Sequence, residues 1–155
     1  VRTESWEQNL AWLKSRKIDA VSLIVPWSDR DFVVVSDPYI TYSAMILVRD
    51  DEQRNLTLDN LGGLRVAVPN DYTGEAFLRE NYPDIMIVET IDPAHGIRLL
   101  STGGVDAFFG GQAVADYMAN KERIDNIRVA SETSFQYSNG FGVRDDWGIF
   151  AGIIS

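Results

Sequence analysis

The sequence predicts an α/β fold with mostly parallel sheets, divided into two lobes. Short apolar segments rich in β-branched residues alternate with amphipathic segments along most of the 155-residue chain, which is the pattern of strand–helix–strand units. A polar, charged stretch at 49–55 separates two apolar regions. Two pairs of similar segments also recur far apart in the chain. These observations together favour a chain that leaves one lobe and later returns to it.

The early part of the chain predicts one helix followed by three strands. Residues 5–17 carry apolar side chains at i, i+4 and i+7 spacing from Trp6 onward, which predicts a helix with Ser5 as its N-cap. A turn is expected at 36–39, because Pro38 fixes its own φ and disfavours helix in the residue before it. Apolar runs rich in β-branched residues predict strands at 18–25, 32–35 and 42–48.

The central part of the chain alternates between expected strands and expected helices. The expected strands are residues 64–68, 85–89 and 105–109. The expected helices are residues 74–81, 93–100 and 112–120. This alternation favours parallel strands joined by crossover helices. Beyond it, the sequence predicts strands at 127–130 and 140–143 and a last helix at 146–154.

Composition and charge exclude several classes of function. Apolar residues make up 45% and charged residues 24% of the chain, as in ordinary globular proteins. The absence of cysteine and the single histidine argue against zinc-thiolate sites, cysteine nucleophiles and histidine metal clusters, so we expect no metal and no cofactor. The formal net charge of −9 repels phosphate backbones, which excludes nucleic acid as an expected partner. No apolar run approaches the roughly 20 residues of a membrane span.

Two internal echoes stand out. Ile-Asp-Ala at 18–20 resembles Val-Asp-Ala at 105–107, and each follows a predicted helix and begins a predicted strand. The pattern Tyr-Ser-x-x-x-x-Val-Arg-Asp-Asp occurs at 42–51 and again at 137–146. The echoes fit two similar lobes, and they equally fit a common way of ending a strand. The sequence leaves both interpretations open.

Taken in order, these motifs resemble the family 3 extracellular solute-binding proteins. The first matches are the Asp-Ala strand at 17–20, the Ser-Asp-Arg loop at 28–30 and the Ser-Asp-Pro-Tyr turn at 36–39. The next are the Leu-Gly segment at 61–68 and the second Asp-Ala strand at 104–110. The segment 137–147 most resembles the Venus-flytrap sensor domains of bacterial signalling proteins such as histidine kinases. The resemblance covers nearly the whole chain.

The resemblance implies a two-lobed, periplasmic-binding-protein-like fold of type II. In the family, a strand, a ligand-contacting loop and a long helix come before the segment that starts here at Arg2, so we expect lobe one to be incomplete. Lobe one would comprise residues 1–49 and 141–155, and lobe two residues 56–136. Residues 50–55 and 137–140 would be the hinge crossings between the lobes.

The implied function is non-catalytic binding of a small anionic or carboxylate-bearing solute in a cleft between the lobes, which closes on the ligand to signal. Alternatives are the solute-binding component of an ABC importer, a dehydratase-like enzyme on the same fold, and a structural module that only transmits conformation. The expected location is the periplasmic or extracellular side of a bacterial inner membrane. A tether to a membrane span beyond Ser155 and a homodimer through lobe one are further expectations.

Arg30 is the first candidate ligand residue. Its guanidinium offers a planar fork of donors that matches a carboxylate, and its position matches the arginine that holds the ligand carboxylate in the family. The alternative is a solvated loop arginine paired with Asp29 or Asp31. The neighbouring residues Trp27 and Ser28 complete this candidate half of the site.

Thr73, Tyr72 and Gly111 form the candidate half in lobe two. Thr73 would begin a helix whose free N–H groups attract anions, although threonine also serves as a plain N-cap. Tyr72 is a candidate aromatic wall, and Gly111 permits close approach of a ligand to the backbone. The family's amino-acid binders carry an acidic residue at the position of Gly111, so its absence argues against an amino-acid ligand. Nearby carboxylates lie in no catalytic motif, so no catalytic residue is expected.

Overall fold

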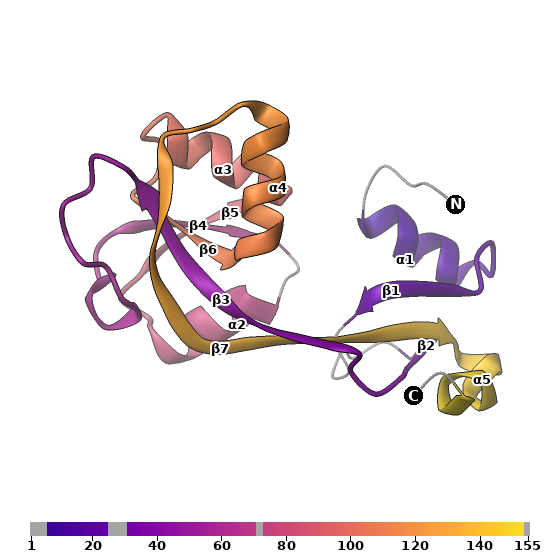
Figure 1. Ribbon diagram of the computed structural model, residues 1–155. Helices are drawn as coiled ribbons and strands as arrows, with labels where there is room; N and C mark the ends of the chain where they lie inside the picture. Colours follow the sequence, from indigo (N-terminus) through magenta and orange to yellow (C-terminus); the bar gives the residue numbers. More distant parts are fainter. Residues whose placement is uncertain (1–5, 25–30, 71–72, 154–155) are drawn as a thin grey trace. The chain divides into compact units, whose positions relative to one another are not determined.

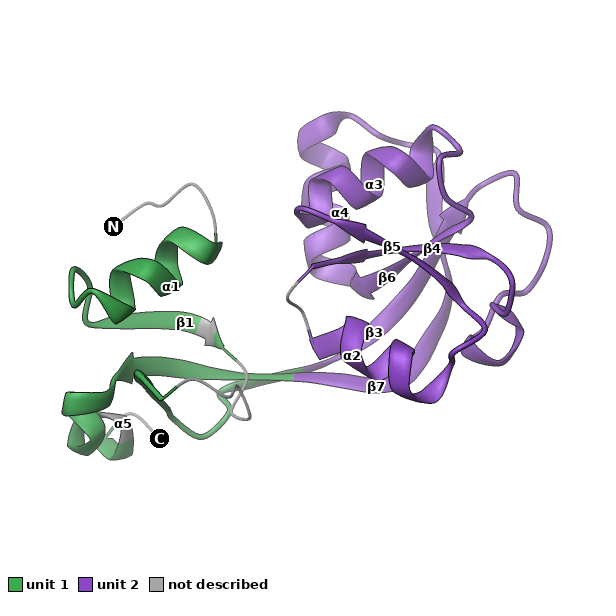
Figure 2. Cartoon of the chain, turned by 180° about the vertical axis from the view of Figure 1, so that it is seen from behind, with its two compact units in different colours: residues 1–41, 138–155 green, residues 42–137 purple. Residues whose placement is uncertain are grey.

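The computed structural model describes residues 6–24, 31–70 and 73–153 (Figure 1). Its contacts divide the chain into two compact units (Figure 2). Unit 1 comprises residues 1–41 and 138–155, and unit 2 comprises residues 42–137. The chain therefore passes between the units within two long strands, β3 (Ile40–Arg49) and β7 (Ile127–Arg144). Residues 50–55, which the sequence suggested as a crossing, lie inside unit 2.

Unit 1 is built around the last part of β7. The other elements are α1 (Trp6–Lys14), β1 (Ala20–Ile24), β2 (Val33–Val35), the 3-10 turn η2 (Asp145–Trp147) and α5 (Gly148–Ile153). Both β1 and β2 pair antiparallel with β7. Three side chains form the buried core, namely Leu13, Val21 and Ile24. The apolar face of α1 supplies the first of them, as its spacing predicted.

Unit 2 contains a five-strand sheet with helices on both faces. Its strand order is β7-β3-β6-β4-β5. The three strands followed by helices are β4 (Arg65–Pro69), β5 (Met86–Thr90), which lies at the edge of the sheet, and β6 (Ala107–Gly111). The helices are α2 (Thr73–Asn81), α3 (Pro93–Ser101) and α4 (Gln112–Glu122), with a 3-10 turn η1 (Leu58–Asn60) after β3. Figure 1 shows α2 on one face of the sheet and α3 with α4 on the other.

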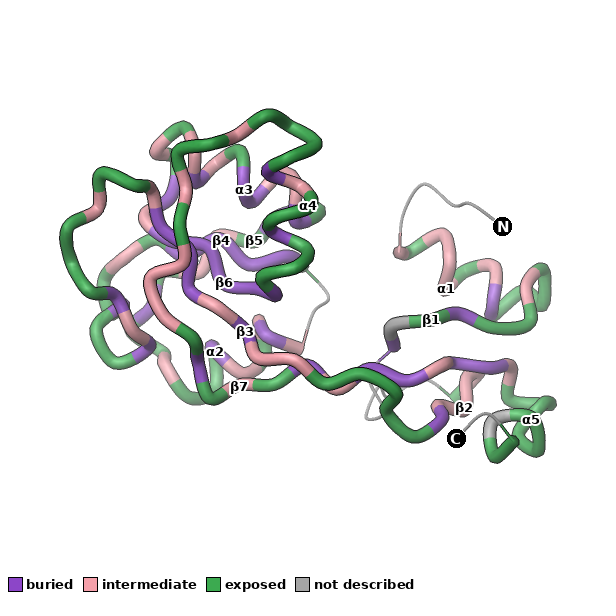
Figure 3. The backbone as a smooth tube through the Cα atoms, in the orientation of Figure 1, coloured by how far each residue is buried: buried purple, intermediate pink, exposed green. Residues whose placement is uncertain are grey.

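Alternating side chains of β6 fill the core on both faces of this sheet. Phe109 packs in the cluster that includes Leu78 of α2, and Phe108 packs in the cluster that includes Ile97 of α3 and Ala115 of α4. Because successive side chains of a strand point to opposite faces, one short strand anchors both helical layers. Figure 3 shows the buried positions concentrated along β4 and β6.

The mixed α/β class is confirmed, but the sheets are less parallel than expected. β4 pairs parallel with β5 and with β6, as the alternation predicted. β3 pairs antiparallel with β6, and the pairings of β1 and β2 with β7 in unit 1 are antiparallel. The difference arises because β3 and β7 carry the chain into and out of unit 2 rather than belonging to a strand–helix–strand crossover.

Two further elements differ from the sequence prediction. β7 is one strand of 18 residues, whereas the sequence predicted two short strands. The prediction missed the middle of β7 because residues 131–139 are mostly polar and aromatic rather than β-branched. The last helix is shorter than expected and follows a 3-10 turn. Within the described part of the chain, no helix has the length and apolar character needed to cross a membrane.

Candidate functional site

The carboxyl ends of β4 and β6 lie at the same edge of the sheet of unit 2. α2 begins four residues after the end of β4, and β6 leads directly into α4. Open α/β sheets bind ligands at this edge, where the first N–H groups of each helix have no partner within the helix. Thr73 and Gly111 are the two predicted ligand residues found here. Trp27, Ser28, Arg30 and Tyr72 lie outside the described residues.

Thr73 is the first residue of α2, and its hydroxyl has no partner. Oγ1 of Thr73 is buried and forms no hydrogen bond in the part of the chain that the structure describes. A buried hydroxyl without a partner costs about 1–3 kcal/mol. A ligand oxygen that accepts a hydrogen bond from this hydroxyl would offset that cost.

Two tyrosines pack against glycines at this edge. A Cβ atom on Gly74 would lie 2.5 Å from Oη of Tyr137, and a Cβ atom on Gly111 would lie 2.6 Å from Cε2 of Tyr42. The two tyrosine rings contact each other, with 5.3 Å between their centroids. Tyr137 is buried, and Tyr42 is partly exposed. No side chain fits at either glycine without a shift, and both glycines are buried, so the aromatic rings pack directly on the backbone at the starts of α2 and α4.

Neither tyrosine is among the ligand residues predicted from the sequence. Each tyrosine begins one copy of the Tyr-Ser echo, and the structure places the two copies next to each other. β3 and β7 are neighbours in the sheet, so Tyr42 and Tyr137 lie side by side, and the hydroxyls of Thr41 and Ser138 are 3.2 Å apart. The sequence signal for this pair of neighbouring tyrosines was the recurrence of Tyr-Ser in the two strands that carry the chain between units.

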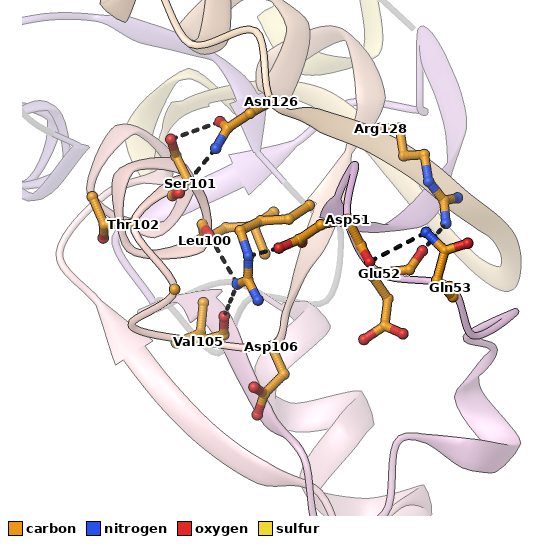
Figure 4. Close-up of polar contacts among 12 residues, drawn as sticks. Asp51, Glu52, Gln53, Leu100, Ser101, Thr102, Val105, Asp106, Asn126 and Arg128 are labelled. Atoms are coloured by element: carbon orange, nitrogen blue, oxygen red, sulfur yellow. Dashed lines mark hydrogen bonds and ion pairs between the residues drawn. The ribbon is translucent and has the colours of Figure 1, made fainter.

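Arginines at the opposite edge of the sheet are held by a polar network (Figure 4). Arg49, at the end of β3, donates from Nη1 to the carbonyl oxygens of Leu100 (3.3 Å) and Val105 (3.0 Å). Arg128 donates from Nη2 to the carbonyl oxygen of Glu52 at 2.7 Å. These bonds satisfy backbone acceptors after α3 and in the loop that follows β3. The network therefore stabilises the fold at the edge where β6 begins.

The echoed aspartates and arginines also have structural partners. Asp106, before β6, pairs with Arg65 of β4, and Asp19, before β1, pairs with Arg144 of β7, each at 2.9 Å between nitrogen and oxygen. The Val-Arg-Asp-Asp copies each place their arginine against the aspartate two residues later, at 3.3 Å for Arg49 and 2.6 Å for Arg144. Strand-end stabilisation thus accounts for the charged residues of both echoes.

The chain was compared with curated proteins and with protein-family models. No family model matches it. It is 26% identical over 132 residues to the virulence sensor protein BvgS of Bordetella pertussis, which covers 84% of this chain and 11% of that protein. It is 26% identical over 140 residues to the ABC transporter arginine-binding protein 1 of Escherichia coli, which covers 86% of this chain and 56% of that protein. The chain thus spans a small part of the sensor and little more than half of the transport protein.

Solved structures show the same relationship. The periplasmic VFT2 domain of Bordetella pertussis BvgS superposes with a TM-score of 0.86 and 22% identity, over 97% of this chain and 66% of that one. A histidine kinase sensor domain with similarity to periplasmic binding proteins gives a TM-score of 0.81 and 24% identity, over 99% and 68% of the two chains. The chain has the Venus-flytrap fold. The arginine-bound form of truncated ArgBP from T. maritima shares it, with a TM-score of 0.81, 23% identity and coverage of 99% and 72%.

These likenesses confirm the predicted resemblance of this Venus-flytrap chain to sensor domains and solute-binding proteins. The matched proteins are sensors and binding proteins by name, and the matched BvgS domain is periplasmic, in line with the expected location. Their identities near 25% do not by themselves transfer a ligand to this chain. The chemistry of the site has to come from the residues at the edge of the sheet.

Carboxylates at both edges of the sheet of unit 2 are engaged by neighbouring groups. Hydrogen bonds from Arg65 hold the pKa of Asp106 below its ordinary value. Hydrogen bonds from Arg54 lower the pKa of Glu52 to about 2. Both carboxylates belong to the edge where β6 begins. At the other edge, Glu75 of α2 pairs with Arg79, and Asp92 accepts a hydrogen bond from the backbone N–H of His95 as the cap of α3.

The pairing of Asp106 with Arg65 predicts a pH effect on stability. Because the pKa of Asp106 is lower in the folded protein, its contribution is present above the unfolded-state pKa of about 3.9 and is lost as the pH falls through the folded-state pKa. Asp106→Asn should therefore flatten the acid limb of the stability curve. At pH 7 the loss should stay below about 1 kcal/mol, because the pair is partly exposed to solvent.

Urea unfolding measured from pH 2 to pH 7 checks this prediction. Asp116→Asn on α4 is the control, because the exposed Asp116 carboxylate forms no ion pair with the described residues. An acid limb of the same slope in Asp106→Asn and in the unmodified protein would show that the pair contributes nothing to stability.

Proposed function

We propose that this chain binds a small anionic or carboxylate-bearing solute without transforming it, and that binding serves to signal. The observation that carries the proposal is the buried, unpartnered hydroxyl of Thr73 at the start of α2. A helix N-terminus carries a positive partial charge, and the hydroxyl adds a hydrogen-bond donor at the same place. An anion that accepts from both would be stabilised there. Two acids at the same edge of the sheet are engaged elsewhere, Glu75 with Arg79 and Asp92 with the backbone N–H of His95.

Four residues outside the described part of the chain complete the proposed site. Arg30 is proposed to hold the ligand carboxylate through its planar fork of donors. Trp27, Ser28 and Tyr72 are proposed to line the same ligand. Their support is the sequence resemblance and, for Tyr72, its position next to Thr73.

Signalling is proposed ahead of transport because, at equal sequence identity to the BvgS sensor and to the arginine-binding transport protein, the BvgS VFT2 domain superposes with a TM-score of 0.86 against 0.81 for arginine-bound ArgBP. The alternative is the binding component of an ABC importer, which the similarity to an arginine-binding transport protein supports. A dehydratase-like activity would need a carboxylate that faces the ligand as a general acid or base. The engagement of Glu75 and Asp92 favours binding without chemistry.

A thermal-shift screen of small carboxylates, phosphate, sulfate and amines tests this proposal. We expect at least one carboxylate to raise the melting temperature, because a ligand at one hundred times its Kd stabilises the folded state by about 2.7 kcal/mol. NMR of the same sample after incubation should return the ligand unchanged. Consumption of the ligand would establish an enzyme, and a panel in which no anion stabilises the protein would contradict the proposed function.

We also propose a periplasmic location, a tether to the membrane and pairing of two copies through unit 1. The edge strand β1 supports the pairing, because it pairs only with β7 among the described strands. A hollow of about 450 Å³ lies beside it, lined by Asn9 and residues 17–22. Edge strands with unpaired backbone groups recruit further strands.

Light scattering of the 155-residue chain tests this pairing. We expect a dimer whose β1 amides are protected from hydrogen exchange. Ser22→Pro, which removes one N–H group from β1, should shift the equilibrium toward monomer. A monomer at all concentrations would contradict pairing through unit 1.

A further inference from the structure

Asn139 and Gly140 form the single Asn-Gly pair of the sequence, and both residues lie in β7. The backbone nitrogen of the residue after an asparagine is able to attack the side-chain amide carbon. Glycine at that place favours the attack, because it has no Cβ atom in the way and its backbone rotates freely. Every other asparagine of the chain is followed by a residue with a side chain. Asn139 is therefore the asparagine most prone to this reaction in an unfolded chain.

Packing against the turn at 36–39 explains why glycine follows Asn139. A Cβ atom on Gly140 would lie 2.7 Å from the carbonyl oxygen of Ser36 and 3.0 Å from its hydroxyl oxygen. The carbonyl oxygen belongs to the backbone, so it moves aside only if the turn itself shifts. The fold therefore requires at position 140 the residue that makes Asn139 reactive.

The folded strand protects Asn139 from this attack. The residue is 5% exposed, and its carbonyl oxygen accepts a hydrogen bond from the N–H of Tyr39 at 3.0 Å. The N–H of Phe141 donates to Oγ of Ser36 at 2.9 Å. Attack by the Gly140 nitrogen requires residue 139 to rotate out of the extended conformation of a strand. This rotation would disrupt both hydrogen bonds, so the reaction requires β7 to open locally from the turn.

We propose that Asn139 is a site of spontaneous deamidation whose rate is controlled by the opening of β7 from the turn at 36–39. In the open state the Gly140 nitrogen gives up its proton to water and forms a bond to Cγ of Asn139. The bond between Cγ and the side-chain nitrogen breaks, and this nitrogen leaves as ammonia after taking up a proton from water. Water then opens the cyclic succinimide and gives aspartate or isoaspartate. The reaction needs no ligand, so it does not depend on the proposed function.

Deamidation would place a charge at a sensitive point of the fold. Tyr137 is the last residue of unit 2, so Asn139 lies just past the point where β7 enters unit 1. A carboxylate buried there without a partner costs free energy. Asn139→Asp should therefore raise the unfolding equilibrium constant about tenfold or more. Asn120→Asp, at an exposed position of α4, is the control and should have an effect of less than about threefold.

Peptide mapping by mass spectrometry, after incubation at mildly alkaline pH with and without urea, tests the site. In urea we expect deamidation first at Asn139, ahead of Asn55 and Asn120, which are followed by leucine and lysine. Without urea the rate at Asn139 should be at least about tenfold lower, because reaction requires the local opening. Faster reaction at Asn55 or Asn120 in urea would overturn the site. Equal rates at Asn139 with and without urea would overturn its control by opening.

Two variants test the control by the turn in the folded protein. Ser36→Ala removes the hydroxyl that accepts from Phe141 and should raise the folded-state rate at Asn139 about tenfold. Thr41→Val is a milder change, because it removes only the exposed hydroxyl that pairs with Ser138 at 3.2 Å, and should raise the rate about threefold.

Hydrogen exchange in the peptide covering 138–142 should accelerate in parallel with deamidation in both variants, because the same opening exposes its amides. Ser22→Ala, at an exposed serine of β1, is the control and should change neither rate. A folded-state rate at Asn139 that stays at the level of the unmodified protein in both variants, or that rises equally in Ser22→Ala, would overturn the proposal.

Discussion

Phe109→Ala is expected to lower the free energy of unfolding by about 3–5 kcal/mol, as large-to-small substitutions of buried aromatic residues do. Phe109 is fully buried at the centre of β6. Its ring lies 6.4 Å from that of Phe77 on α2 and 6.0 Å from that of Phe135 on β7, between centroids. Removing the ring would leave a cavity between the sheet and α2, because three separate elements meet on it.

Urea unfolding monitored by far-ultraviolet circular dichroism measures this loss, because α2, α3 and α4 all belong to unit 2 while the four tryptophans belong to unit 1. Tyr117→Ala is the control, because Tyr117 is an exposed aromatic residue of the same unit, and its removal should change the free energy of unfolding by less than about 0.5 kcal/mol. The packing of Gly74 against Phe109 also predicts that α2 loses its position, so ligand stabilisation should weaken in Phe109→Ala. A loss below about 1 kcal/mol would contradict the assignment of Phe109 to the core.

Arg30→Ala is expected to weaken the binding of a carboxylate ligand by about 2–5 kcal/mol, because removal of one partner leaves the other charge without its hydrogen bonds. Folding stability should change little. Arg30→Lys should restore only part of the affinity, since an ammonium group lacks the planar fork that matches a carboxylate. Calorimetry with the most stabilising acid of the thermal-shift panel measures both variants.

Arg54→Ala is the matched control for Arg30→Ala. Arg54 is an exposed arginine that pairs with Glu52, 2.6 Å away, in the loop that follows β3 at the other edge of the sheet. Its removal lowers the positive charge of the protein by the same amount and should leave the affinity unchanged. Equal affinity in Arg30→Ala and the unmodified protein would remove Arg30 from the proposed site.

The elements that sequence reasoning recovered are those whose pattern is local. The helices α2, α3 and α4 and the strands β4, β5 and β6 follow from period and turn residues. The course of β7 was missed, because residues 131–139 pair in a sheet through tertiary contacts and not through a β-branched run. One crossing between lobes was predicted at the charged stretch 50–55, but those residues belong to unit 2. For example, the N–H of Asp50 donates a hydrogen bond to the carbonyl oxygen of Asn126 in the same unit.

The candidate site was predictable only in part. Thr73 and Gly111 follow from their places after strands, and the structure brings them to one edge of the sheet. Tyr42 was not predictable as a site residue, because its position over Gly111 depends on the pairing of β3 with β6, two segments about 65 residues apart in the chain. The echoed charged residues attracted notice in the sequence, yet their ion pairs stabilise strand ends.

Hydrogen–deuterium exchange, measured with and without the most stabilising acid of the panel, tests most directly where the ligand binds. The proposed function predicts slower exchange at the first turns of α2 and α4, in peptides covering residues 73–78 and 111–116. Peptides covering the polar network at 98–106 should exchange equally in both states. Slower exchange confined to that network, or unchanged exchange at both helix starts under saturating ligand, would contradict binding at the edge where β4 and β6 end.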